Sequence, residues 1–219
     1  MPPLRAAVAG LIAQVAVLVP FAPSPSGWLA GLACGTVVCV ALAVGAHRSG
    51  VTRLGPANLV TLARSALTGG VTALAVDARP ALLVASVAAV ALATDFVDGQ
   101  VARRTGTSSS LGARFDMEVD AFLLLVLSGY VAMSVGWWVL AIGAWRYLYI
   151  GAGRLVPWLR RPVPDSTARK AVAAAQGVVL AVAASGLLPR PAAVTLAAAP
   201  LAVLTVSVAR DIRWQYGNR

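Results

Sequence analysis

Long apolar runs separated by short polar loops dominate this 219-residue chain. Hydrophobic residues make up 59% of it and charged residues 12%, and the mean hydropathy is +0.80. A helix needs about 20 consecutive apolar residues to cross a bilayer. Backbone groups in lipid must bond to one another, so runs of this length fold as helices. The pattern predicts an all-α fold, a polytopic transmembrane helical bundle of about eight spans.

The predicted spans are bounded by Gly, Pro or basic residues, which interrupt or end helices. They cover residues 4–21, 28–46, 58–76, 81–102, 112–135, 137–152, 171–187 and 192–208.

The first run has two interpretations. Arg5 at its start and the Pro/Ser-rich stretch PFAPSPSG at its end are compatible with a cleaved signal peptide. We favour a retained helix, because the next run begins almost at once and the two can pair. We therefore expect an N-terminal transmembrane hairpin over residues 1–50 and a six-helix transmembrane domain over residues 51–219.

The formal net charge is +10, which in a soluble protein would suggest nucleic acid. Here the basic residues sit in short loops, which favours positive-inside topology and anionic lipid, with no nucleic-acid partner. If the loop after the fourth span is cytoplasmic, the opposite side holds only Arg79 and Arg190, while Arg64 and Arg146 lie within spans. We expect a multi-pass protein of the cell (plasma) membrane, with both termini and the acidic cluster described next facing the cytoplasm.

Five of the eight acidic residues lie in one 26-residue stretch, DFVDGQVARRTGTSSSLGARFDMEVD. Asp95 and Asp98 are three apart, and Asp116 and Asp120 are four apart, so each pair shares one face of a helix. The first pair closes an apolar run and the second opens the next. All four carboxylates can therefore meet where two adjacent helices leave the membrane. Glu118 lies off that face and is expected to be an ordinary interfacial charge.

Clustered carboxylates at a membrane need compensating positive charge. Arg103 and Arg114 cannot neutralise four of them. Oxygen ligands suit Mg²⁺, Mn²⁺ or Ca²⁺, and no His or Cys lies nearby to favour zinc. Two divalent ions bridged by carboxylates form a clamp for phosphoryl transfer. The acids by themselves leave a second interpretation open, a salt-bridged network without chemistry.

The stretch resembles the signature of the CDP-alcohol phosphotransferase family, D-x2-D-G-x2-A-R-x8-G-x3-D-x3-D. Upstream, the segment PANLVTLAR resembles the family's N-x2-T-x2-R on its first core helix. The resemblance covers roughly residues 56–210. Its matching signature positions are Asp95, Asp98, Gly99, Ala102, Arg103, Gly112, Asp116 and Asp120.

The resemblance implies a transferase of phospholipid biosynthesis. It would move a substituted phosphate, expected to be phosphatidyl, from a CDP-alcohol such as CDP-diacylglycerol to an alcohol and release CMP. The implied ligands of two divalent cations, Mg²⁺ or Mn²⁺, are Asp95, Asp98, Asp116 and Asp120. Asp120 is also the implied general base. The residues implied to bind the CDP moiety are Asn58, Thr61, Arg64, Gly99, Ala102 and Arg103.

An acceptor that carries phosphate needs cations near the general base. Candidates are Arg146, Arg154 and Lys170, followed by Gln176. Their spacing resembles phosphatidylglycerophosphate synthases, which favours glycerol 3-phosphate, although Tyr147 stands where those enzymes place an acid. Phosphatidylinositol phosphate synthases also use a basic pocket in this region, so inositol phosphate or another polar alcohol is the alternative. For each cation, topological charge is the competing interpretation.

Two functions from other classes stay open. A cation transporter also uses membrane carboxylates, but these sit at helix ends, and ion conduction leaves Gly99, Ala102 and Arg103 unexplained. A non-catalytic membrane protein that binds CDP-lipid is the other, although the signature is complete. The family commonly dimerises, so the resemblance also suggests a homodimer.

Overall fold

The computed structural model describes residues 1–105, 110–160, 163 and 167–217, without the side chains of residues 57, 96–105, 110, 160 and 167–170. The described residues form eight α-helices, three 3₁₀ segments and no strand, which confirms the all-α fold. The α-helices are α1 (Pro3–Leu18), α2 (Pro25–Arg48), α3 (Pro56–Val76), α4 (Ala81–Thr105), α5 (Ser110–Val135), α6 (Leu140–Leu155), α7 (Thr167–Ala184) and α8 (Arg190–Gly217). The 3₁₀ segments are η1 (Val19–Phe21), η2 (Trp137–Val139) and η3 (Pro157–Arg160).

Within the described residues, five helices are long and apolar enough to cross a membrane: α1 with η1, α2, α3, α5 and α8. Helices α4 and α7 contribute shorter apolar stretches, Ala81–Asp95 and Ala171–Ala184. Helix α6 has only 16 residues, fewer than the roughly 20 that span a bilayer. Each of the eight expected spans contains a helix, and five of these helices meet the length and composition of a span within the residues whose side chains the structure describes.

Proline residues account for several helix starts. Helices α1, α2 and α3 each have Pro in the first turn, where its missing N–H costs nothing. Ser24 also caps α2, because its hydroxyl accepts the N–H of Gly27 at 3.2 Å. Between α3 and α4 the chain reverses through Ala78, whose φ is +48°. These local features place the turns where the sequence predicted them.

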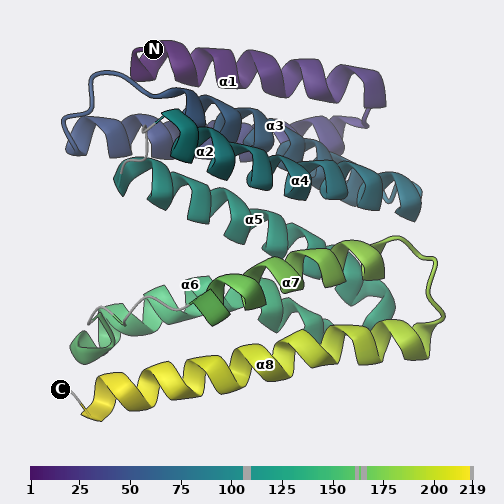
Figure 1. Cartoon of the computed structure of the whole chain (residues 1–219). Coiled ribbons are helices and arrows are strands. Elements are labelled where there is room, and N and C mark those ends of the chain that lie inside the picture. The colour runs from purple at the N-terminus through teal and green to yellow at the C-terminus, as the bar shows by residue number, and fades with distance from the viewer. Residues whose placement is uncertain (106–109, 161–162, 164–166, 218–219) are drawn as a thin grey trace.

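The helices run back and forth between two ends of the molecule (Figure 1). Both termini lie at one end, together with the start of α3, the end of α4 and the start of α5. The N-terminal hairpin of α1 and α2 packs against α3, and α3 packs against α4 and α5. Helix α5 then connects this group to α6, α7 and α8.

Two apolar clusters hold the bundle together. The larger joins α3, α4, α5 and α7 with part of α8, and its fully buried members include Leu74, Leu127 and Leu180. The smaller joins the N-terminal hairpin to α3 and α5. It contains Phe115 and Val119, each next in sequence to an aspartate of the acidic stretch. Packing of the hairpin therefore helps to orient α5 where the acids begin.

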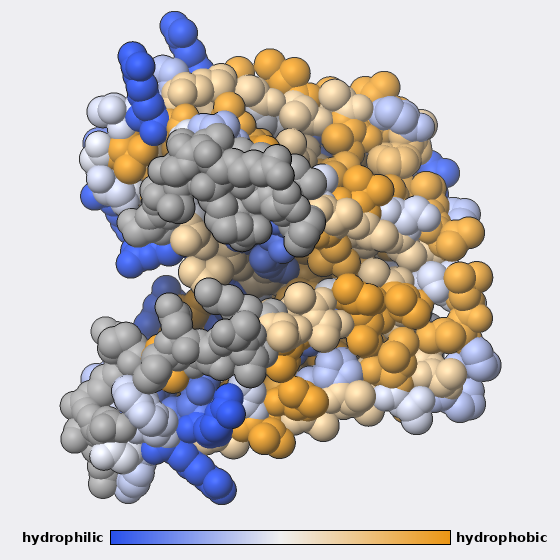
Figure 2. Space-filling model, in the orientation of Figure 1, coloured by the Kyte–Doolittle hydropathy of each residue, from blue (hydrophilic) through white to orange (hydrophobic). Residues whose placement is uncertain are grey.

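Hydrophilic side chains gather at the end that holds the termini (left in Figure 2), while apolar side chains cover most of the remaining visible surface. This is the distribution expected when one end of a bundle faces water and its sides face lipid.

Candidate functional site

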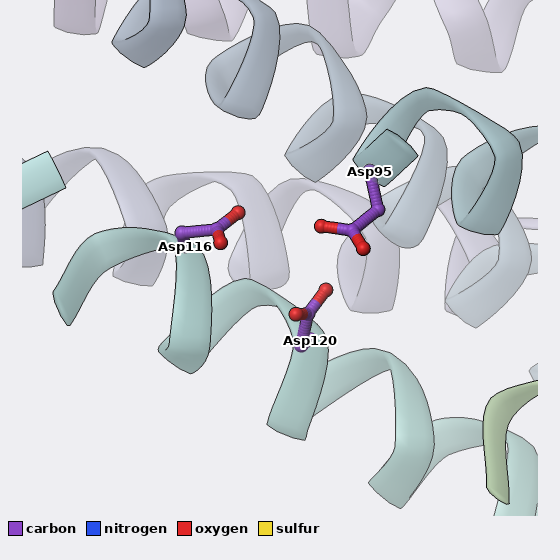
Figure 3. Close-up of side chains that lie close together, drawn as sticks. All are labelled: Asp95, Asp116 and Asp120. Atoms are coloured by element: carbon purple, nitrogen blue, oxygen red, sulfur yellow. The ribbon is translucent and has the colours of Figure 1, made fainter. Parts of the chain in front are cut away.

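Three aspartates from two helices converge at the end of the bundle that holds both termini. Asp95 lies on α4, and Asp116 and Asp120 lie one turn apart on α5. One carboxylate oxygen from each lies within 4.8 Å of the others. Figure 3 shows the three side chains pointing toward one another. The structure therefore brings together three of the four acids that the sequence grouped.

The local fold explains this convergence. The acidic stretch of the sequence begins at Asp95 on α4, and only four residues separate α4 from α5, so α5 starts beside the end of α4 (Figure 1). Asp116 and Asp120 are separated by four residues, which places both on the same face of α5. The side chain of Asp98 lies outside the described part of the structure.

Arg64 of α3 contacts all three aspartates. Its Nη1 donates to Asp95 and its Nη2 donates to the carboxylate of Asp116. Nη2 also lies 3.2 Å from Asp120 Oδ1 and 3.4 Å from the carbonyl oxygen of Asp116. One guanidinium thus joins α3 to both helices that carry the acids.

Burial differs sharply between the cation and the acids. The side chain of Arg64 is 1% exposed, whereas those of Asp95, Asp116 and Asp120 are 45%, 34% and 39% exposed. The carboxylates therefore have an open side, and the guanidinium lies on their closed side.

The donor set fits a hard divalent cation. All three side chains offer carboxylate oxygens, which Mg²⁺, Mn²⁺ and Ca²⁺ prefer. Three negative charges face the single positive charge of Arg64, so these four groups carry a net negative charge. The open side of Asp95, Asp116 and Asp120 is where such an ion can be held.

The residues expected to bind the CDP moiety divide into two sets. Asn58 and Thr61 are 5% and 3% exposed and lie on the same face of α3 as Arg64. Arg64 on that face contacts Asp95 of α4 and Asp116 of α5, so the face turns toward these two helices. The backbone of α4 continues to Thr105, but the side chains of the second set lie outside the described part of the structure: Gly99, Ala102 and Arg103.

Of the cations expected to bind the acceptor, Arg146 and Arg154 have side chains that the structure describes. Arg146 of α6 forms an ion pair with Glu118 of α5 at 2.5 Å. Glu118 is two residues from each aspartate of α5, about 200° around the helix. Arg154 is exposed and borders a pocket of about 600 Å³, whose lining includes Tyr149 and Gln215 but none of the three aspartates. The side chain of Lys170 lies outside the described residues.

Two relationships were missed by the sequence interpretation. Arg64 was assigned to the donor alone, yet it contacts all three aspartates. Glu118 was considered an ordinary interfacial charge, yet it pairs with Arg146. The sequence did contain a signal for both ion pairs. An arginine within an apolar helix requires a counter-charge, and this chain has few acids to supply one.

Comparison with known families agrees with the geometry. The family model described as CDP-alcohol phosphatidyltransferase matches residues 54–209, from the loop before α3 to the later turns of α8. Neither a curated protein nor a solved structure matched the chain.

Proposed function

This chain belongs to the CDP-alcohol phosphatidyltransferase family, and from that premise we propose that it transfers a phosphatidyl group from CDP-diacylglycerol to a small polar alcohol and releases CMP. Membership makes it an integral membrane transferase of phospholipid synthesis, with a CDP-alcohol donor and an alcohol acceptor. The observation that carries the proposal for this chain is the convergence of Asp95, Asp116 and Asp120 at one end of the bundle.

The family generally uses divalent metal ions. We propose two, Mg²⁺ or Mn²⁺, held by Asp95, Asp98, Asp116 and Asp120. Bound there, the ions would offset the negative charge of the diphosphate and of CMP as it leaves. The all-oxygen donor set and the net negative charge of the cluster support this assignment.

For the donor, we propose that Asn58 and Thr61 of α3 bind the CDP moiety together with Gly99, Ala102 and Arg103 of α4. The support is the signature in the sequence and the orientation of α3 toward α4. Gly99 and Ala102 have little or no side chain, so a nucleotide can approach the backbone there. Arg103 offers a charged fork that suits a diphosphate.

For the chemistry, we propose Asp120 as the general base. Its carboxylate takes the proton of the acceptor hydroxyl, and that oxygen attacks the β-phosphorus of the donor. The bond from this phosphorus to the oxygen that bridges to the α-phosphate breaks, and CMP leaves with that oxygen. Asp120 is 39% exposed and lies 3.2 Å from Arg64, so an acceptor hydroxyl can reach its carboxylate.

For the acceptor, we propose an alcohol that carries phosphate, glycerol 3-phosphate first and inositol phosphate second. Arg146, Arg154 and Lys170 are the proposed binding cations. Arg154 is exposed and borders a pocket of about 600 Å³, and Arg146 forms an ion pair with Glu118. The proposed role of Lys170 rests on its position in the sequence.

We further propose that the acidic end faces the cytoplasm of a cell (plasma) membrane, which the bias of Lys and Arg toward that end supports. The hairpin of residues 1–50 lies outside the matched residues 54–209 and is proposed as a separate unit of the fold. A homodimer rests on family resemblance alone.

The test is CMP release by the purified protein in detergent, with CDP-diacylglycerol and Mg²⁺ or Mn²⁺. Glycerol 3-phosphate, inositol 1-phosphate, inositol and serine serve as separate acceptors. We expect metal-dependent release with one acceptor. Asp120→Asn should reduce kcat about 100-fold or more, since a general base typically contributes that much.

Other outcomes would contradict the proposal. Undiminished turnover in Asp120→Asn would exclude it as the base. If the protein binds CDP-diacylglycerol but releases no CMP with any acceptor, the non-catalytic lipid-binding function would be favoured. Metal flux through proteoliposomes without any CMP release would favour the transporter.

A further inference from the structure

The three carboxylates that pair with Arg64 lie between its guanidinium and the open side of the site. Its side chain is 1% exposed beneath three aspartates that are each at least one-third exposed. A nucleotide that approaches from the open side meets the carboxylates, or cations bound to them, first. Contact with the Arg64 guanidinium would require those carboxylates to move away.

The contacts of Arg64 are distributed between helices. Nη1 holds Asp95 of α4, and Nη2 holds Asp116 and Asp120 of α5. A guanidinium is planar and offers its donors in a rigid fork. Because the two arms bind different helices, the fork sets the distance between the acid of α4 and those of α5.

The charge of Arg64 has a second effect. Three carboxylates with oxygens within 4.8 Å of one another repel each other. One buried positive charge reduces that repulsion and still leaves the group negative enough to attract a divalent cation. Arg64 thereby keeps the acids close together before any ligand arrives.

We propose that Arg64 is a positioning residue: it holds Asp95, Asp116 and Asp120 at metal-ligand spacing and does not contact the CDP donor. The proposal rests on the proposed function, in which this cluster binds the metal ions. It assigns Arg64 a role different from the one that family resemblance implied. Groups that orient metal ligands typically alter metal affinity by 10- to 100-fold when they are replaced.

The test compares Arg64→Lys with Asn58→Ala, a variant of a proposed donor residue. Mn²⁺ affinity is measured by electron paramagnetic resonance without substrate, and CDP-diacylglycerol affinity is measured without acceptor at saturating Mn²⁺. We expect Arg64→Lys to weaken Mn²⁺ binding about tenfold or more, because an ammonium cannot bridge both helices, and to leave donor affinity unchanged. Asn58→Ala should weaken donor binding and leave Mn²⁺ affinity unchanged. Normal Mn²⁺ affinity with weakened donor binding in Arg64→Lys would overturn the proposal.

A second measurement uses the wild-type protein, in case Arg64→Lys does not fold. Phenylglyoxal modifies accessible guanidinium groups, and mass spectrometry locates the adducts. Exposed Arg114 should react, whereas Arg64 should stay unmodified with or without CDP. An Arg64 that reacts and is protected by CDP would identify a donor ligand. Failure of the wild-type protein to bind Mn²⁺ or release CMP would instead contradict the proposed function itself.

Discussion

The carboxylate of Asp77 accepts hydrogen bonds from both the backbone N–H and the hydroxyl of Ser24, at 2.7 and 2.5 Å. Asp77 follows the last residue of α3, and Ser24 precedes the first residue of α2. Arg79 adds hydrogen bonds to the carbonyl oxygens of Phe21 and Ala22, each at 2.8 Å. These contacts fasten the N-terminal hairpin to the core at the end opposite the aspartate cluster (Figure 1).

The contact between Ser24 and Asp77 predicts a pH dependence of stability. Donation by the Ser24 hydroxyl, and then by its backbone N–H, holds the pKa of Asp77 below its ordinary value of 3.8. A carboxyl whose pKa is lower in the folded state stabilises the fold above its unfolded pKa and loses that effect as the pH falls through the folded value. The contribution of Asp77 is therefore complete at pH 7, begins to fall near pH 3.8 and is lost as the pH drops through the folded pKa, which lies below 3.8.

We expect Asp77→Asn to melt at a lower temperature than the wild-type protein at pH 7. The difference between the two melting temperatures should narrow between pH 4 and pH 2. Melting temperatures of both proteins in the same detergent measure it, and Ser24→Ala should show the same narrowing. A gap that stays constant over this pH range would mean that the charge of Asp77 does not stabilise the fold.

A second prediction concerns the close approach of α1 and α3. A Cβ on Gly69 would overlap the amide of Gln14, which is 1% exposed and confined on its other side by Gly35. Gly69→Ala should destabilise the protein by about 1–3 kcal/mol, the usual cost of overpacking. Gly151→Ala is the matched control, because a Cβ there meets nothing within 4 Å. Equal stability of the two variants would contradict the tight packing of Gln14 against Gly69.

Third, two buried glutamines should respond oppositely to replacement by methionine. The amide atoms of Gln14 have no hydrogen-bond partner among the described residues. Gln215 is equally buried, but its Nε2 donates to Leu159 O at 3.0 Å and its Oε1 accepts from the Tyr149 hydroxyl at 2.6 Å. Since an unsatisfied buried polar group costs about 1–3 kcal/mol, Gln14→Met should be neutral or stabilising and Gln215→Met destabilising. Thermal unfolding of both variants tests this, and a loss of stability in Gln14→Met would reveal a partner for its amide.

Fourth, the proposed acceptor cations should contribute unequally. Arg154→Gln should raise the KM for a phosphorylated acceptor about tenfold or more, the effect of losing one charge-assisted hydrogen bond. Arg146→Gln and Glu118→Gln should both alter that KM less. Because this ion pair is 33% and 47% exposed, each should change stability by less than about 1 kcal/mol. A larger KM effect in Arg146→Gln than in Arg154→Gln would show that Arg146 leaves Glu118 to bind the acceptor.

Most of the fold was predictable from the sequence. Apolar run length, together with Pro and Gly at the ends, located all eight helices, because a backbone in lipid has few alternatives to a helix. The sequence did not predict the exact residues at which the helices begin and end. Helix α2, for example, runs from Pro25 to Arg48, beyond both ends of the apolar run over residues 28–46 that predicted it, because residues outside lipid can still extend a helix.

The candidate site was predictable in its acids and not in its cation. Spacing within one helix is local, so Asp116 and Asp120 had to share a face whatever the rest of the chain did. The partners of Arg64 and Arg146 depend on how α3 and α6 rotate against α5, which side-chain packing across the bundle decides. The residue pattern of a single helix does not reveal how that helix is rotated against its neighbours.

The sequence by itself determined that this chain is a helical membrane protein with an acidic cluster between two of its helices, because run length and helical periodicity are properties of the chain. Only the tertiary structure decided that Arg64 lies beneath that cluster, that Glu118 pairs with Arg146, and that the N-terminal hairpin packs on α3. These are contacts between segments distant in sequence, and they depend on which surfaces fit together when the helices pack.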